Sequence, residues 1–150
     1  MKTINEMRTG ALLRSAYQEV AKIINQKMES VGYEDIRTTH TPVLQPLYFS
    51  DSGLTATELA ERSGITKQSM GELVKYLERQ GYIHREKSQK DLRAWLIVLT
   101  PKGIEMMNKL YGIVTELDEE FAKKFGEESF SDLRDKLLNF IPIVQTINKR

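Results

Sequence analysis

Apolar residues recur at three- and four-residue spacing along most of this chain, which is the periodicity of amphipathic helices. The first such stretch covers residues 9–31 and is followed by Gly32, a residue type common just past a helix end. The same spacing returns over residues 101–125 and again over residues 129–147. The pattern therefore predicts long helices toward both ends of the chain.

Between these long stretches the pattern predicts three shorter helices. One begins at Thr41-Pro42, where proline suits a first helical turn. The next covers residues 55–63, and Thr55 with Glu58 three residues later forms the signature of a capping box. The third begins after Thr66, runs to residue 80 and carries a buried stripe of Met70, Leu73, Val74 and Leu77.

Residues 54–80 have the features of a helix-turn-helix. Ala60 is small where the two helices must approach closely, and Gly64 lies at a turn that needs a left-handed backbone. Two β-prone segments follow, residues 82–85 and 93–99, and the polar segment between them reads as a hairpin loop. The fold class predicted is mainly α with a small β-hairpin, which after such a helix pair is a wing.

Charge is distributed unevenly along the chain, although the net charge is only +1. Residues 62–93 hold eight basic and four acidic side chains, a balance of +4. Residues 116–135 hold eight acidic and three basic side chains, a balance of −5. A protein with this segregation can present one end to an anion and turn the other away. Ordinary surface charge remains an alternative explanation.

Composition narrows the classes of function. The chain has no cysteine, so it forms no disulfide and no thiolate metal site, and its two histidines fall in different predicted elements. We therefore expect no metal and no cofactor. No run of eighteen apolar residues exists and the first residues lack the apolar core of a signal peptide, so we expect a cytoplasmic protein without membrane contact.

An enzyme is disfavoured by the arrangement of the polar residues. Asp118, Glu119 and Glu120 are consecutive on a predicted helix, so their carboxylates fan around it instead of converging on one substrate. Neither a nucleophile–base pair nor a glycine-rich phosphate loop is apparent. We expect no catalytic residue.

The helix-turn-helix and the wing instead suggest contacts with DNA. Side chains near the start of the second helix could reach base edges, while lysines and backbone N–H groups could bind phosphates. In an extended wing, Asp91 and Arg93 would point to the same side, so Asp91 could orient the Arg93 guanidinium toward a minor groove. A solvated turn with an incidental ion pair is the alternative. The candidate DNA-binding residues are Thr55, Thr66, Lys67, Gln68, Ser69, Glu72, Lys75, Lys87, Lys90, Asp91 and Arg93.

These segments together resemble the MarR family of bacterial transcription regulators. The resemblance rests on residues 54–60, 66–74 and 76–83, on Asp91-Leu92-Arg93-Ala94, and on Leu99-Thr100-Pro101-Lys102-Gly103. Asp-x-Arg in the wing and the Leu-Thr-x-Lys-Gly that follows are its most specific parts. One departure is Ser88-Gln89, where the family often carries Asp-Pro.

The resemblance implies a single MarR-like domain over residues 1–150 that forms a homodimer. Residues 38–100 would be the winged helix-turn-helix lobe, and residues 1–32 and 104–150 the helical dimerisation region. The apolar stripes of the terminal helices also favour a dimer, because one small lobe offers little apolar surface for them to bury against. The alternative is that these helices close the core of a monomer. The implied partner is double-stranded DNA with a palindromic operator, and the implied role is a repressor.

The resemblance also implies a small effector, commonly aromatic or anionic, bound between the dimer helices and the DNA-binding lobe. Candidate residues for lining such a site are Tyr17, His40, Leu44 and Tyr48, and ordinary core packing is the alternative for each. A rival function is a winged-helix protein-interaction module without specific DNA binding. Such modules usually lack a basic wing, whereas this wing has Lys87, Lys90 and Arg93.

Overall fold

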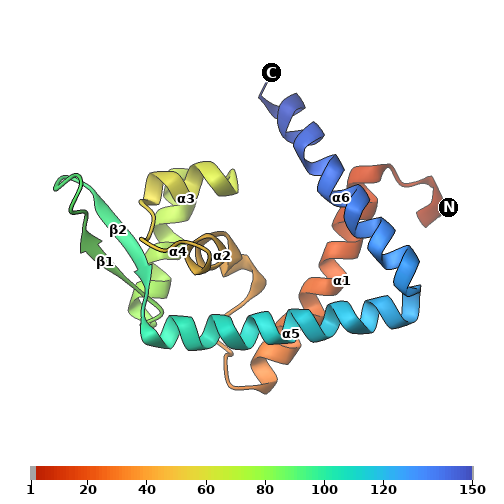
Figure 1. The fold of residues 1–150 in the computed structure, drawn as a ribbon, viewed down its shortest axis with the longest axis horizontal. Coiled ribbons are helices and arrows are strands. Elements are labelled where there is room, and N and C mark those ends of the chain that lie inside the picture. Colours follow the sequence, from red (N-terminus) through yellow and green to blue (C-terminus); the bar gives the residue numbers. More distant parts are fainter. Residues whose placement is uncertain (1–2, 150) are drawn as a thin grey trace. The chain divides into compact units, whose positions relative to one another are not determined.

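A computed structural model describes residues 3–149, and its chain divides into two compact units, Met1–Tyr111 and Gly112–Arg150. Most of it is helical, with one antiparallel two-stranded hairpin, as the sequence predicted (Figure 1). The elements are η1 (Ile4–Glu6), α1 (Thr9–Ser30), η2 (Thr38–His40), α2 (Thr41–Tyr48), α3 (Ala56–Ser63), α4 (Lys67–Arg79), β1 (Ile83–Lys87), β2 (Trp95–Leu99), α5 (Pro101–Phe125) and α6 (Glu127–Asn148). Within residues 3–149, no helix has the length and apolar character needed to cross a membrane.

The hairpin differs from the prediction at both of its inner ends. β1 extends to Lys87, and β2 begins only at Trp95, because these two residues are the last cross-strand pair of the hairpin. The expected strand start at Arg93 is wrong, since that residue lies in the turn. The loop of the wing therefore covers residues 88–94 instead of 86–93.

The core of the first unit lies between α2, α3, α4 and the hairpin, which gather in one part of Figure 1. Its fully buried side chains include Leu44, Leu59, Met70, Leu77 and Ile97, one or more from each of these elements. The predicted stripe of α4 is mostly confirmed, because only Leu73 remains partly exposed.

A β-bridge ties the start of the helix-turn-helix to the wing. The N–H of Leu54 donates to the carbonyl oxygen of Ile97 at 3.1 Å, and the N–H of Ile97 donates back to the Leu54 carbonyl at 2.8 Å. Both side chains are buried. The neighbouring Gly53 has φ +82°, and a Cβ there would lie 2.5 Å from a methyl carbon of Val98, so only glycine fits this approach.

The Leu-Thr-x-Lys-Gly motif fastens the first turn of α5 to the turn that follows α4. Thr100 Oγ1 donates to the carbonyl oxygen of Gly81 at 2.6 Å and accepts from the N–H of Gly103 at 3.1 Å. Lys102 places its ammonium 4.4 Å from the centroid of the Tyr82 ring. A Cβ on Gly103 would collide with the Tyr82 carbonyl oxygen. Thr100, Lys102 and Gly103 of the motif thus hold the first turn of α5 against the turn after α4.

The second unit consists of the later part of α5 and of α6. Arg134 Nη1 lies 3.0 Å from Asp118 Oδ2, and the rings of Phe121 and Phe130 pack with centroids 6.2 Å apart. None of the described residues of α6 is buried. Its exposed apolar side chains are Leu133, Leu138, Phe140, Ile141, Ile143, Val144 and Ile147.

Candidate nucleic-acid interface

The helix-turn-helix begins with the capping box that the sequence predicted at α3. The N–H of Glu58 donates to Thr55 Oγ1 at 3.2 Å, and the N–H of Thr55 donates to Glu58 Oε2 at 2.8 Å. Gly64 ends the helix with φ +69°, the left-handed conformation expected of the turn. The half-buried Thr55 therefore has a role at the helix start whether or not it contacts a ligand.

At the start of α4, two of the candidate residues bind each other. Thr66 Oγ1 accepts from the N–H of Ser69 at 3.1 Å and lies 3.0 Å from Ser69 Oγ. Their cap satisfies one amide and leaves the first turn of α4 exposed, with Lys67 and Gln68 open to solvent. Glu72 and Lys75, also exposed, continue from Gln68 along the same face at spacings of four and three residues.

The loop of the wing is a closed turn. Its ends are joined by the N–H of Ser88, which donates to the Ala94 carbonyl at 3.0 Å. Ser88 is 8% exposed, and its Oγ accepts from the N–H groups of Lys90 and Asp91 at 3.3 and 3.2 Å. A hydroxyl that accepts from amides two and three residues later stabilises a turn as a carboxylate would. Ser88 thus supplies a turn-stabilising acceptor at the position where this chain departs from the family's Asp-Pro.

The expected pairing of the Asp91 carboxylate with the Arg93 guanidinium is wrong. Asp91 Oδ1 instead accepts from the backbone N–H of Arg93 at 3.0 Å, and the Ala94 N–H donates to the Asp91 carbonyl at 3.0 Å. The extended conformation assumed from the sequence is absent, because an Asp side chain in a turn readily binds the amide two residues on. The Arg93 guanidinium is exposed and binds no other described residue.

Lys87 is also bound within the wing. Its Nζ donates to the carbonyl oxygen of Leu92 at 3.1 Å and lies 4.3 Å from the centroid of the Trp95 ring. Lys90 is exposed and has no side-chain partner in the described part of the chain. Sequence reasoning missed Ser88 and Trp95, and the pairing of Trp95 with Lys87 becomes visible only once the hairpin register is known.

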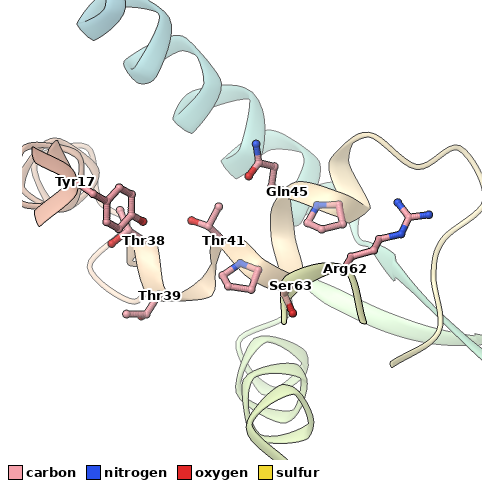
Figure 2. Close-up of a pocket in the computed structure, with 9 residues that line it drawn as sticks. Tyr17, Thr38, Thr39, Thr41, Gln45, Arg62 and Ser63 are labelled. Carbon is pink, nitrogen blue, oxygen red and sulfur yellow. The ribbon is translucent and has the colours of Figure 1, made fainter. Parts of the chain in front are cut away.

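The four effector candidates do not meet at one place. Tyr17 lines a shallow pocket of about 440 Å³, and Figure 2 shows its ring at one end and Arg62 at the other. The other lining residues are Thr38, Thr39, Thr41, Pro42, Gln45, Pro46 and Ser63. Leu44 is 1% exposed and belongs to the core. Tyr48 lines a separate hollow, and its hydroxyl lies 2.8 Å from Asn108 Oδ1.

His40 is held by its neighbours in a way that the sequence did not reveal. Its ring stacks on that of Tyr76 in α4, with centroids 4.8 Å apart and planes 14° from parallel. Its Nδ1 accepts from the backbone N–H of Arg37 at 3.0 Å. Burial lowers the pKa of His40, an effect that Asp35 opposes and Arg37 reinforces. A neutral imidazole is the form that can accept this hydrogen bond.

Comparison with known proteins gives this lobe its family. A model of the MarR family matches residues 35–94, which include the helix-turn-helix and the loop of the wing. The transcriptional regulator SarZ of Staphylococcus aureus is 30% identical over 125 residues, which are 83% of this chain and 82% of SarZ. The chain belongs to the MarR family.

A solved structure similar to this MarR-family chain has the same fold and contains DNA. The structure of Staphylococcus aureus MepR in complex with DNA superposes with a TM-score of 0.75 at 25% identity, covering 91% of this chain and 98% of MepR. A regulator of the hcr operon in Thauera aromatica is 26% identical over 78 residues, and the chain spans only 47% of that protein's length. The expected winged-helix fold is confirmed. The MarR-family chain is a DNA-binding transcription regulator.

Proposed function

We propose that this regulator is a homodimeric repressor that binds a palindromic double-stranded DNA operator through α4 and the wing. The observation that carries the proposal is the exposure of polar side chains at two places on one lobe, the start of α4 and the wing. Gln68 and Lys67 are exposed to solvent at the start of α4, and the Arg93 side chain is exposed on the wing. A lobe of this kind can read a major groove with its helix and reach the adjacent minor groove with its wing.

Different side chains would make different kinds of contact with the duplex. Gln68 suits a base edge, since its amide both donates and accepts. Lys67, Lys75 and Lys90 suit phosphates, and Arg93 suits a narrow minor groove because its charge is otherwise unpaired. The remaining candidates on the helices, Thr55, Thr66, Ser69 and Glu72, would bind or orient groups around these contacts.

Dimer formation is supported by the apolar side chains of the terminal helices. In α1 only Met28 is buried, while Leu12, Leu13 and Tyr17 are exposed, and the described part of α6 has no buried residue. Apolar stripes of this extent are usually covered by another chain. A two-fold dimer would present two α4 helices, and this arrangement matches a palindromic operator.

An effector is supported by the chemistry of the pocket in Figure 2. Three threonine side chains and the Gln45 amide offer hydrogen bonds, the Tyr17 ring offers a flat apolar surface, and Arg62 offers a positive charge. This set suits a small aromatic or anionic molecule. Binding there would act by favouring one of two conformations of the dimer, with no chemical step.

The test is a mobility-shift titration of the protein on the DNA that flanks its own coding sequence, repeated across salt concentrations. A sequence-specific repressor should bind this DNA saturably and far more tightly than competitor DNA, and its affinity should fall steeply with salt because counterions are released. An affinity no better than that for competitor DNA contradicts the proposal. It would favour a winged-helix module that binds another protein.

A further inference from the structure

The peptide group between Leu92 and Arg93 is held at both of its ends by side chains of opposite charge. Its carbonyl oxygen, which belongs to Leu92, accepts from Lys87 Nζ at 3.1 Å. Its N–H, which belongs to Arg93, donates to Asp91 Oδ1 at 3.0 Å. The plane of one peptide therefore has two charge-assisted hydrogen bonds, and this plane sets the direction in which the Arg93 side chain leaves the backbone.

The Lys87 ammonium is itself fixed by the hairpin. Lys87 and Trp95 are directly paired across the strands, and the ammonium lies 4.3 Å from the centroid of the indole ring. The attraction of a cation to an indole face competes with its attraction to a phosphate. The Leu92 carbonyl uses one of the three N–H donors of this ammonium, so a phosphate would have to share the ammonium with that carbonyl and with the ring.

Lys90 lies in the loop of the wing, which begins just after Lys87. Its side chain is exposed and forms no hydrogen bond or ion pair with another described residue, while its backbone N–H donates to Ser88 Oγ at 3.3 Å. It carries the same charge as Lys87 and lies three residues away. Lys90 is thus the candidate phosphate contact of the wing and a matched control for Lys87.

We propose that Lys87 is a positioning residue for DNA binding, which aims the Arg93 guanidinium by holding the Leu92–Arg93 peptide, and that it is not itself a phosphate contact. The proposal rests on the proposed insertion of Arg93 into DNA. It departs from the expectation that every lysine of the wing touches DNA. Asp91 has the same role at the other end of the peptide, and Trp95 supports Lys87 from the opposite strand.

The first measurement compares Lys87→Gln with Lys90→Gln by titrating operator DNA across salt. A lost phosphate contact lowers the slope of log affinity against log salt by about 0.9. Because the proposed dimer loses one such contact on each protomer, we expect Lys90→Gln to reduce the magnitude of the slope by about 1.8. Lys87→Gln should weaken binding by about threefold to tenfold at unchanged slope, since only the aim of Arg93 is lost. Lys87→Arg, which keeps the charge, the donors and the stacking on Trp95, should restore most of the affinity.

The second measurement is a double-mutant cycle with Arg93→Ala. If Lys87 acts through Arg93, Lys87→Gln has little further effect once Arg93 is absent, whereas the effect of Lys90→Gln adds in full. Trp95 is the only tryptophan of the chain, so its fluorescence reports on the same contact in the free protein. The emission should change in Lys87→Gln and stay as it is in Lys90→Gln.

The outcomes separate this proposal from the proposed function. A reduced salt slope in Lys87→Gln, together with an effect that adds to Arg93→Ala, would make Lys87 a phosphate contact; it would overturn the positioning role and leave the repressor intact. Wild-type protein without preference for operator DNA would overturn both. Binding by Arg93→Ala at wild-type affinity would also contradict the positioning role, because Arg93 would then make no contact with DNA for Lys87 to orient.

Discussion

Tyr82 donates its phenolic hydroxyl to the carboxylate of Asp35, 2.8 Å from Oδ1 and 2.9 Å from Oδ2. The hydroxyl of Tyr76 donates to the main-chain carbonyl of the same aspartate at 2.7 Å. The loop between α1 and α2 is thereby attached both to α4 and to the residue that precedes β1. Burial and the adjacent carboxylate raise the pKa of Tyr82, so its hydroxyl remains a donor at all physiological pH values.

Tyr82→Phe should destabilise the protein. The ring would still fill its buried site, but the Asp35 carboxylate would lose its phenolic donor, and a hydrogen bond to a charged group contributes about 1.5–3 kcal/mol. Urea unfolding followed by circular dichroism measures this loss. Tyr33→Phe is the control, because Tyr33 contacts the Tyr82 ring without a hydrogen bond to Asp35, and it should change stability by less than about 0.5 kcal/mol. Equal losses in the two variants would contradict the assignment.

The pH dependence of stability should contain a contribution from His40. Its pKa in the folded protein lies below the ordinary value of 6.5, so the unfolded chain binds more protons at His40 than the folded protein does. The stabilisation is complete above pH 6.5 and is lost as the pH falls below 6.5 toward the folded pKa.

The variant His40→Asn isolates this contribution. The Asn amide oxygen can accept from the Arg37 N–H as the imidazole does, and it does not titrate. The free energy of unfolding should therefore fall less in His40→Asn than in the wild type between about pH 8 and about pH 5. Parallel curves for the two proteins would show that His40 titrates alike in the folded and unfolded states.

Arg93→Ala should weaken operator binding and leave folding unchanged. The guanidinium binds no described residue of the protein, and an arginine contact with DNA contributes about 1–3 kcal/mol. A mobility shift gives the affinity, and thermal unfolding gives the stability. Lys123→Ala removes one positive charge from the acidic segment at residues 116–135 and should bind the operator as the wild type does. If both variants lose affinity equally, the effect of Arg93 is one of net charge alone.

Gly103→Ala should be destabilising by about 1–3 kcal/mol, since its Cβ would collide with the Tyr82 carbonyl oxygen and force α5 away from the end of α4. Gly112→Ala in the same helix is the matched control. Nothing lies within 4 Å of the Cβ position there, so alanine should be neutral or stabilise the helix by up to about 1 kcal/mol. Thermal melts of the two variants should shift in opposite directions or, at the least, differ clearly.

Ile141→Asp should dissociate the proposed dimer. Ile141 is 50% exposed on α6, so a change there disturbs few contacts within its own chain. Leu137, one turn earlier on the same face, is partly buried in its own chain, so its substitution would also affect folding. A charge buried between two apolar helices has no partner and is costly. Sedimentation velocity should show a monomer, with a helical circular dichroism spectrum retained. A variant that still sediments as a dimer would place the interface elsewhere.

Local features of the helix-turn-helix were predictable from the sequence because each depends on residues close together in the chain. The capping box joins Thr55 to Glu58, the α4 cap joins Thr66 to Ser69, and Gly64 adopts the left-handed turn by itself. Rules for caps and turns act over three or four residues, and they held here.

The interior of the wing and the surroundings of His40 were not predictable in this way. The pairing of Lys87 with Trp95 requires the hairpin register, and a shift of one residue would put the two side chains on opposite faces. The stacking of His40 on Tyr76 joins residues that are far apart in the sequence. Such contacts follow from tertiary packing, to which spacing along the chain is no guide.

The β-bridge between Leu54 and Ile97 has a consequence for the DNA sequences that this regulator can use. Because the bridge lies within one lobe, the fold of that lobe alone fixes the distance from α4 to the wing. Neither a partner chain nor an effector is needed to fix it. We expect every functional operator to keep one invariant number of base pairs between the segment read by α4 and the segment reached by the wing. Variation among operators should be confined to the spacer between the two halves of the proposed palindrome.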